Sequence, residues 1–279
     1  MLESVAILGG RGMLGSDVTD HLKRNGYAVQ VWDLPDWDIT RPADRERALQ
    51  NTDVVVNCAA FTQVDKAEEQ PDIAMAVNAT AVGDLGRLAK RRGLFLVHIS
   101  TDFVFDGQGN QPYQETDTPS PLSVYGESKW KGELALRETA CAHAIMRVEW
   151  SYGRQGVNFI SKFLERARAG SELKVVNDQF GAPTWTADMA KAIGCLIRGR
   201  HAGLYHFANS EYASRYDVAG FIAERLNLTN KVRPCSSGEF PVQAARPSNS
   251  RFNTARIRSV LDYSIRPWQN ALDEFLALR

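Results

Sequence analysis

A glycine-rich turn near the start of the chain constrains the fold more than any other feature. An apolar run at residues 4–8 is followed by GGRGMLG and then by a pattern with apolar residues at helical spacing. Gly9, Gly12 and Gly15 therefore lie where a buried strand turns into a helix. Such a turn lets a pyrophosphate approach the backbone at the helix N-terminus, although the same glycines could form a turn without a ligand.

Apolar runs and helical patterns alternate through the first half of the chain, which is typical of a parallel sheet covered by helices. Further strands are expected at residues 28–32, 53–58, 94–99 and 144–148. We therefore predict an α/β fold with a doubly wound, Rossmann-like parallel sheet. Ligands bind at the carboxyl ends of such strands, where Asp33, Ala59, Ala60 and Thr101 fall.

The second half of the chain predicts a smaller lobe interleaved with the sheet. Helices are expected at residues 159–169, 187–198, 216–226 and 268–278, strands at 173–176 and 204–207, and irregular structure at 231–253. Residues 1–153 would form the dinucleotide-binding domain, which residues 184–208 would rejoin. Residues 154–183 and 209–279 would form the substrate-binding lobe.

The composition narrows the class of protein. The 279 residues carry 33 basic and 33 acidic side chains, and this balance argues against binding to nucleic acid or to a membrane surface. No signal peptide or apolar segment of membrane-spanning length is visible. The four cysteines match no metal-ligand spacing, so we predict no metal site and a reducing, cytoplasmic location.

A tyrosine and a lysine define the predicted catalytic group. Tyr125 and Lys129 are four residues apart, so on a helix they lie on one face. A lysine ammonium close by would lower the pKa of the tyrosine hydroxyl and make it a usable acid. Thr101, at the preceding strand end, could hold a carbonyl oxygen. The spacing alone is weak, because tyrosine and lysine are common on exposed helix faces.

A carboxylate at the end of the second predicted strand affects the expected preference between NADH and NADPH. Asp33 lies where a carboxylate accepts a ribose hydroxyl, and its charge disfavours the 2′-phosphate of NADP. Arg11, inside the glycine-rich turn, could offset that repulsion. The cofactor is therefore expected to be NADH or NADPH, with a preference for NADH. Asp33 could instead be only a turn residue at the strand end.

Several longer motifs carry a resemblance that covers nearly the whole chain. They are GGRGMLG, VVVNCAAFTQVDKAE, ISTDFVFDG, ETDTPSPLSVYGESKWKGE, DQFGAPT, GLYHFAN and ARPSNSRFNT. With them the chain resembles the extended short-chain dehydrogenase/reductase family, and within it the dTDP-4-dehydrorhamnose reductases. The resemblance implies that hydride from NAD(P)H and a proton from Tyr125 reduce the C4 keto group of a dTDP-linked 4-keto-6-deoxy sugar to give dTDP-L-rhamnose for polysaccharide synthesis.

The resemblance also implies individual residue roles. The catalytic residues would be Thr101, Tyr125 and Lys129. The cofactor would contact Gly9, Gly12, Met13, Leu14, Gly15, Asp33, Asp38, Ile39, Ala59, Ala60, Thr62, Tyr125 and Lys129. The substrate would contact Val64, Asp102, Phe103, Trp150, Arg246 and Asn249. Simpler roles stay open for three of these, since Trp150 could cover the core, Arg246 could lie on the surface and Asp102 could cap a loop.

The chain departs from the family at Val148-Glu149, where threonine and serine commonly precede the tryptophan, and a glutamate there could alter the sugar pocket. Two other functions remain open. A nucleotide-sugar epimerase can use the same catalytic group with tightly held NAD. Similar proteins also serve as regulatory subunits of methionine adenosyltransferase. A homodimer is possible.

Overall fold

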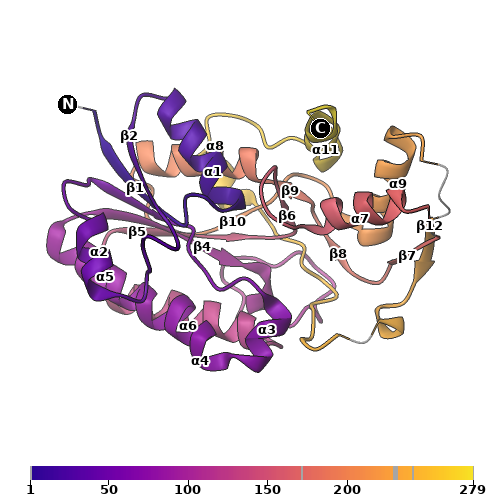
Figure 1. Cartoon of the computed structure of the whole chain (residues 1–279), viewed down its shortest axis with the longest axis horizontal. Coiled ribbons are helices and arrows are strands. Elements are labelled where there is room, and N and C mark those ends of the chain that lie inside the picture. Colours follow the sequence, from indigo (N-terminus) through magenta and orange to yellow (C-terminus); the bar gives the residue numbers. More distant parts are fainter. Residues whose placement is uncertain (1, 171, 229–231, 241, 279) are drawn as a thin grey trace.

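The structure, a computed structural model, describes residues 2–170, 172–228, 232–240 and 242–278. Its larger lobe is built on a six-stranded parallel sheet (Figure 1). The strand order is β10-β5-β4-β3-β1-β2. The strands are β1 (Ser4–Leu8), β2 (Ala28–Trp32), β3 (Val54–Asn57), β4 (Phe95–Thr101), β5 (His143–Val148) and β10 (Gly203–Phe207). The doubly wound parallel sheet predicted from the sequence is confirmed.

Helices cover both faces of the sheet, as the apolar strands require. On one face lie α1 (Met13–Arg24) and α8 (Thr186–Arg198); on the other lie α2 (Pro42–Ala48), α5 (Ala81–Arg92) and α6 (Val124–Glu138) (Figure 1). Alternate side chains of one strand enter different cores. Val54 and Val56 pack with α1 and α8, whereas Val55 packs with α5 and α6.

The strand order reverses beside β1. Strand β2 pairs with one edge of β1 and β3 pairs with the other, so the connecting segments leave in opposite directions. This reversal opens a crevice at the carboxyl ends of the strands, where open α/β sheets bind ligands. The glycine-rich turn after β1 lies at this point.

The segment between β3 and β4 is divided into several short helical pieces and one longer helix. It consists of α3 (Val64–Glu69), α4 (Pro71–Met75) and a π-helical turn (Ala76–Thr80) before α5. The π turn carries the buried Asn78, whose amide bonds both backbone groups of Phe61 and donates to the Ser128 hydroxyl at 2.9 Å. Asn78 thus fastens the loop after β3 to α6.

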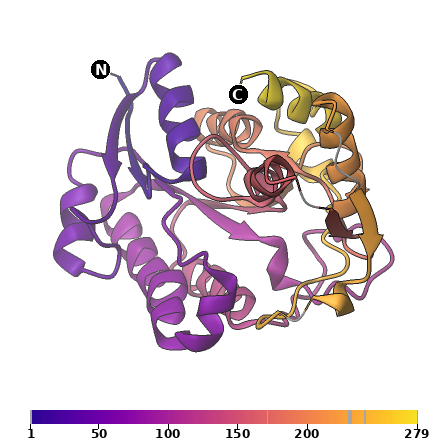
Figure 2. The ribbon, with the colours of Figure 1, turned by 45° about the vertical axis from the view of Figure 1, so that its right-hand side comes forward.

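The smaller lobe lies beside the sheet and has its own apolar core (Figure 2). Its helices are α7 (Phe159–Arg168), α9 (Arg215–Arg225) and α11 (Trp268–Ala277), and the short α10 (Ala255–Arg258) packs by β10. Three two-stranded pairs complete it: β7 (Leu173–Val176) with β12 (Val232–Cys235), β8 (Phe180–Gly181) with β11 (Ala213–Ser214), and β6 (Ser151–Tyr152) with β9 (Thr184–Trp185). No described helix has the length and apolar character to cross a membrane.

Strand β12 corrects the expectation of irregular structure at residues 231–253, of which 231 and 241 lie outside the described residues. It pairs in parallel with β7 despite Pro234, because a proline is tolerated in a strand at a sheet edge.

Candidate functional site

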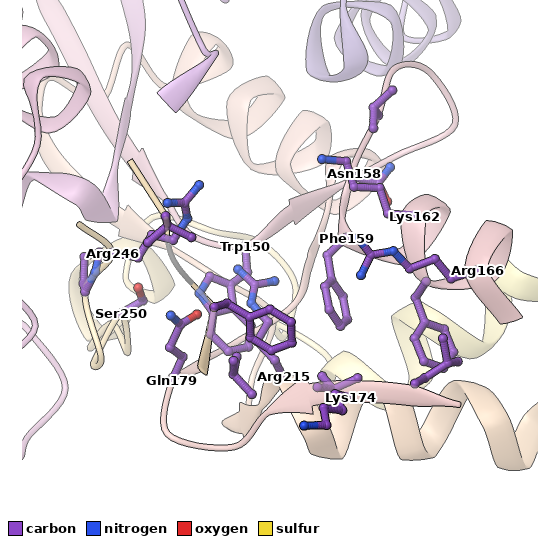
Figure 3. A pocket seen from close by; sticks show the side chains of 18 of the residues that line it. Trp150, Asn158, Phe159, Lys162, Arg166, Lys174, Gln179, Arg215, Arg246 and Ser250 are labelled. Atoms are coloured by element: carbon purple, nitrogen blue, oxygen red, sulfur yellow. The ribbon is translucent and has the colours of Figure 1, made fainter. Parts of the chain in front are cut away.

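Two adjoining cavities lie where the two lobes meet. The first, here called the sheet-edge cavity, has a volume of about 560 Å³ and opens at the carboxyl ends of the strands. The second, here called the lobe cavity, has a volume of about 480 Å³ and lies in the smaller lobe (Figure 3). Both cavities are lined by Phe103, Trp150, Val157, Phe159 and Arg215. These shared residues form the junction between the cavities.

The sheet-edge cavity brings most of the sequence-predicted residues together. Every residue that we expect to contact the dinucleotide, from Gly9 to Lys129, lines it, as do the three predicted catalytic residues. Four of the predicted substrate residues also line it, namely Val64, Asp102, Phe103 and Trp150. Arg246 lines the lobe cavity instead.

The glycine-rich turn has the geometry of a pyrophosphate cradle. A Cβ atom on Gly15 would lie 2.1 Å from the Gly9 carbonyl oxygen, so only glycine fits there. Gly12 precedes the first turn of α1 and has no side chain with which to cap the N–H groups of that turn. The first backbone N–H groups of a helix have no partner within it, so they are available to an anion in the cavity. These residues fit a dinucleotide.

An acidic and a basic side chain meet where β2 ends at this cavity. Asp33 accepts hydrogen bonds from the backbone N–H groups of Arg11 and Leu34, both at 2.8 Å. The Arg11 guanidinium lies over the same turn, where it pairs with Asp36 at 3.0 Å. The carboxylate that disfavours a 2′-phosphate and the cation that could attract one are therefore both in place.

The predicted catalytic group forms where β4 ends and α6 begins. The Ser123 hydroxyl accepts a hydrogen bond from the Gly126 N–H and starts α6, which carries Tyr125 and Lys129. The Lys129 ammonium donates to the Ile99 carbonyl oxygen at 2.6 Å. The Tyr125 hydroxyl lies close to Thr101, whose own hydroxyl donates to Asp102 at 2.9 Å.

The pKa of Tyr125 differs from the expectation that Lys129 lowers it. Burial, and to a smaller extent the charge of Asp102, raise the pKa of Tyr125 to about 12, and the neighbouring Thr101 hydroxyl acts in the opposite direction. The ammonium of Lys129 is turned to the Ile99 carbonyl, and its own pKa is lowered to about 8 by burial, against which Glu133 acts. Helical spacing brings Tyr125 and Lys129 to one cavity without pairing them.

A buried ion pair joins α6 to the sheet. Glu133, one turn after Lys129, accepts two hydrogen bonds from Arg147 of β5 at 2.8 and 2.7 Å and one from the Ser100 hydroxyl at 2.6 Å. Glu133 and Arg147 are almost completely buried. Separating the two partners would leave an uncompensated buried charge, which is costly. The pair therefore fixes the position of α6 relative to β4 and β5.

Asp102 joins the strand end to the C-terminal part of the chain. Its carboxylate accepts hydrogen bonds from the Ser250 hydroxyl at 2.5 Å and from the Thr101 hydroxyl at 2.9 Å. Burial raises the pKa of Asp102, against these hydrogen bonds. Thr101, rather than Asp102, caps the short turn that follows by accepting from the Phe103 N–H. Asp102 is therefore free of that capping role and lies at the cavity wall.

Glu149, the departure noted in the sequence, is fully buried. Its two oxygens accept hydrogen bonds from the backbone N–H groups of Ala182 at 2.7 Å and Phe252 at 3.1 Å. Burial and the nearby Asp102 raise the pKa of Glu149 well above its usual range. Glu149 thus ties the DQFGAPT loop to the RPSNSRFNT segment, and it lines neither cavity.

Trp150 has a strained backbone and a tightly held ring. Its φ angle of 44° lies in the left-handed region, which is uncommon for an aromatic residue. A Cβ atom on Gly181 would lie 2.7 Å from the ring, so the glycine of DQFGAPT permits this packing. The Arg215 guanidinium lies 3.6 Å from the ring centroid (Figure 3). Sequence reasoning missed Arg215, because an arginine at a helix start usually faces solvent.

Two predicted substrate residues have structural contacts. Arg246 pairs with Asp65 of α3 at 2.7 Å while it lines the lobe cavity. Asn249 lines neither cavity, and its amide donates to the carbonyl oxygens of Gly109 and Gln111 at 2.6 and 2.9 Å. The structure therefore does not bring Asn249 to the substrate region, because its polar atoms hold the loop at residues 107–111. Within the described ranges, no three His, Cys, Asp or Glu side chains gather as a metal site.

Comparisons with known proteins agree with this geometry. The family model described as RmlD substrate binding domain matches residues 3–278. A dTDP-4-dehydrorhamnose reductase of Mycobacterium tuberculosis is 38% identical over 285 residues, which cover 99% of this chain and 93% of that protein. A Streptomyces antibioticus protein named probable dTDP-4,6-dihydroxy-2-methyloxan-3-one 4-ketoreductase is 37% identical, covering 96% and 92% of the two chains.

A solved structure is similar along the whole chain. The crystal structure of dTDP-4-dehydrorhamnose reductase from Bacillus anthracis in complex with NADP has a TM-score of 0.96 and 33% identity, and the match covers 100% of both chains. The sequence resemblance is thereby confirmed. The chain belongs to the RmlD substrate binding domain family, the family of the dTDP-4-dehydrorhamnose reductases within the extended short-chain dehydrogenases/reductases.

Proposed function

We propose that the protein reduces the C4 keto group of dTDP-4-dehydrorhamnose to give dTDP-L-rhamnose, with NADPH or NADH as the reductant. One observation carries the proposal. Thr101, Tyr125 and Lys129 converge on the wall of a cavity that also contains a dinucleotide cradle and that adjoins a second, cationic cavity. The names of the relatives at 38% and 33% identity support the same reaction.

The residues of the sheet-edge cavity would hold the dinucleotide. The glycine-rich turn and the first turn of α1 would bind the pyrophosphate, Asp33 and Asp38 would lie by the adenosine, and Lys129 would hold the second ribose. When bound, the nicotinamide supplies the hydride. Arg11 beside Asp33 supports use of either NADPH or NADH, and NADP is the ligand of the similar Bacillus anthracis enzyme.

Tyr125 would give the proton to the carbonyl oxygen of the sugar. Its high pKa keeps the hydroxyl protonated at neutral pH, as a proton donor must be. Thr101, which lies close to Tyr125, would bind the same oxygen. Lys129 would keep a positive charge in the cavity and so stabilise the phenolate that remains after proton transfer.

The lobe cavity suits a nucleoside diphosphate. It is lined by Lys162, Arg166, Lys174, Arg215 and Arg246, and by no carboxylate among the described residues. Aromatic and aliphatic side chains, including Phe163 and Val175, complete its walls. A dTDP group in this cavity would place the attached sugar through the junction toward Thr101 and Tyr125. We further propose that residues 154–183 and 209–279 act as the substrate-binding lobe of a cytoplasmic enzyme of polysaccharide biosynthesis.

The test is the turnover of Tyr125→Phe with saturating NADPH and dTDP-4-dehydrorhamnose. General-acid catalysis contributes about 10²–10⁴ in rate, so kcat should fall by about that factor while the fold and NADPH affinity are retained. Thr101→Val should cost less, since one neutral hydrogen bond is worth roughly 0.5–1.5 kcal/mol. A loss of less than about threefold in Tyr125→Phe would remove Tyr125 as the acid.

Two results would favour the other functions. An epimerase would retain NAD through purification and interconvert sugars without net oxidation or reduction. A regulatory subunit would show no reductase activity and would bind methionine adenosyltransferase.

A further inference from the structure

Arg215 differs from Lys174 and Arg246, two other cations of the lobe cavity, because each of those two has an ion-pair partner. Lys174 pairs with Glu239 at 2.9 Å, and Arg246 pairs with Asp65 at 2.7 Å. For Arg215, no hydrogen bond or ion pair is found within the described part of the chain. A guanidinium has five N–H donors in a rigid fork, so all of them are available to a ligand.

The guanidinium is nevertheless held in place. Arg215 is the first residue of α9, whose start is fixed by a capping box between Ser214 and Asp217. Ser214 also belongs to β11, which pairs with β8 of the DQFGAPT loop. At its other end the side chain stacks on Trp150 at 3.6 Å (Figure 3). Both ends of the Arg215 side chain are therefore positioned before any ligand binds.

Two nearby carboxyl groups stabilise the charge of Arg215 without forming an ion pair with it. Burial lowers the pKa of Arg215 to about 10, while the nearby Asp102 and Glu149 raise it, so the guanidinium stays protonated at neutral pH. Both carboxylates accept hydrogen bonds from other groups, Asp102 from Ser250 and Thr101, and Glu149 from two backbone N–H groups. The donors of Arg215 thus remain unused.

The location of Arg215 identifies the part of the substrate that it meets. Among the described residues that line both cavities, Arg215 is the only charged one. A dTDP-sugar that spans the two cavities has its diphosphate between the nucleoside and the sugar, which is at the junction. We propose that Arg215 binds this diphosphate and thereby sets the distance between the nucleotide and Tyr125, an inference that rests on the function proposed above. A planar guanidinium matches phosphate oxygens in a bidentate manner.

The experiment measures the dissociation constant of dTDP by calorimetry. Arg215→Met keeps an unbranched side chain on Trp150 but removes the fork, and affinity for dTDP should fall about 10- to 100-fold, as for a lost charge-assisted hydrogen bond. The dTDP affinity of Arg215→Lys should lie between those of the wild type and of Arg215→Met, since lysine keeps the charge but lacks the planar fork of donors. The matched control is Arg225→Met at the other end of α9, where the arginine pairs with Asp273, and it should stay within about twofold.

The outcomes separate this inference from the proposed function. Because dTDP lacks the sugar, a loss seen with dTDP locates the contact on the nucleotide part. Arg215→Met with wild-type affinity, equal losses in the Met and Lys variants, or a parallel loss of NADPH affinity would each overturn the role of Arg215. If Arg215→Met fails to fold, Arg215→Lys decides alone by its dTDP affinity. A wild-type protein that binds dTDP but does not reduce the keto sugar would instead overturn the proposed function.

Discussion

At the residue scale, we expect the buried ammonium of Lys129 to set how the proposed reaction responds to pH. Its pKa is lowered to about 8 by burial, so Lys129 is charged below that pH and neutral above it. Since the charge stabilises the phenolate left on Tyr125, kcat/KM for reduction should fall as the pH rises through about 8. The measurement is the pH profile of kcat/KM with saturating NADPH between pH 6 and about 10.

Thermal unfolding provides the control for this profile. A lysine whose pKa is lowered in the folded state binds fewer protons there than in the unfolded chain. The contribution of Lys129 to the free energy of unfolding therefore increases as the pH rises from about 8 toward its ordinary value of 10.5. Activity lost while the fold is retained would support the assignment. A kcat/KM that stays constant to pH 10 would contradict it.

Asp33 sets the expected preference between the two dinucleotides. Its carboxylate lies at the end of β2, where it would repel a 2′-phosphate, and Arg11 is adjacent. Asp33→Ala should shift the ratio of kcat/KM values toward NADPH by about tenfold, equivalent to roughly 1.4 kcal/mol. Asp20→Ala, which removes an exposed carboxylate from α1 outside both cavities, is the matched control. A wild-type preference for NADPH above about tenfold would show that the role given to Asp33 is wrong.

At the scale of elements, the DQFGAPT loop supports Trp150 and Glu149 beside the cavities. Gly181→Ala would bring a Cβ atom to 2.7 Å from the Trp150 ring and 2.6 Å from the Glu149 carboxylate. The overlap should lower the free energy of unfolding by about 1–3 kcal/mol and raise KM for the sugar nucleotide as Trp150 shifts. Kinetics and denaturant unfolding measure the two effects.

Gly220→Ala is the control for Gly181→Ala. It shows whether an effect comes from steric overlap of the added Cβ atom or only from replacing a glycine. Gly220 lies within α9, and an added Cβ atom would meet nothing within 4 Å. Gly220→Ala should therefore be neutral or stabilise the protein by up to about 1 kcal/mol, because alanine favours a helix. Equal effects of the two substitutions would contradict the support role of Gly181.

The elements of the sheet could be predicted because their signals are local. The apolar runs at β1 to β5 and the glycine-rich turn are visible in the sequence, and the structure places them as expected. Strand β12 was missed because Val232–Cys235 is short, contains a proline and pairs with a distant segment. The break at the π turn was missed because it depends on the contact of Asn78 with Phe61.

The directions of individual side chains could not be predicted in the same way. Spacing placed Lys129 on the face of Tyr125, but the ammonium follows the Ile99 carbonyl. Arg215 becomes recognisable as a site residue only when α9 and Trp150 are brought together in space. Asn249 resembled a substrate residue by motif, and its actual partners are carbonyl groups of a loop more than a hundred residues earlier.

At the scale of the whole molecule, the two cavities should respond to different ligands. In hydrogen exchange, dTDP should protect backbone amides around α7, β7 and the start of α9, while NADPH should protect the glycine-rich turn and the end of β2. Protection by both ligands is expected only near the junction at Phe103 and Trp150. Protection of the glycine-rich turn by dTDP alone would contradict the proposed division into two binding lobes.

The path of the chain between the lobes has a further consequence. The core of the smaller lobe draws on residues before α8 and after β10, while the segment between them belongs to the sheet. No single stretch of sequence can be cut out that contains this lobe and nothing else. A gene rearrangement therefore cannot exchange it as a cassette between enzymes. New sugar preferences on this scaffold must arise by substitutions of residues that line the cavities, or by changes of loop length.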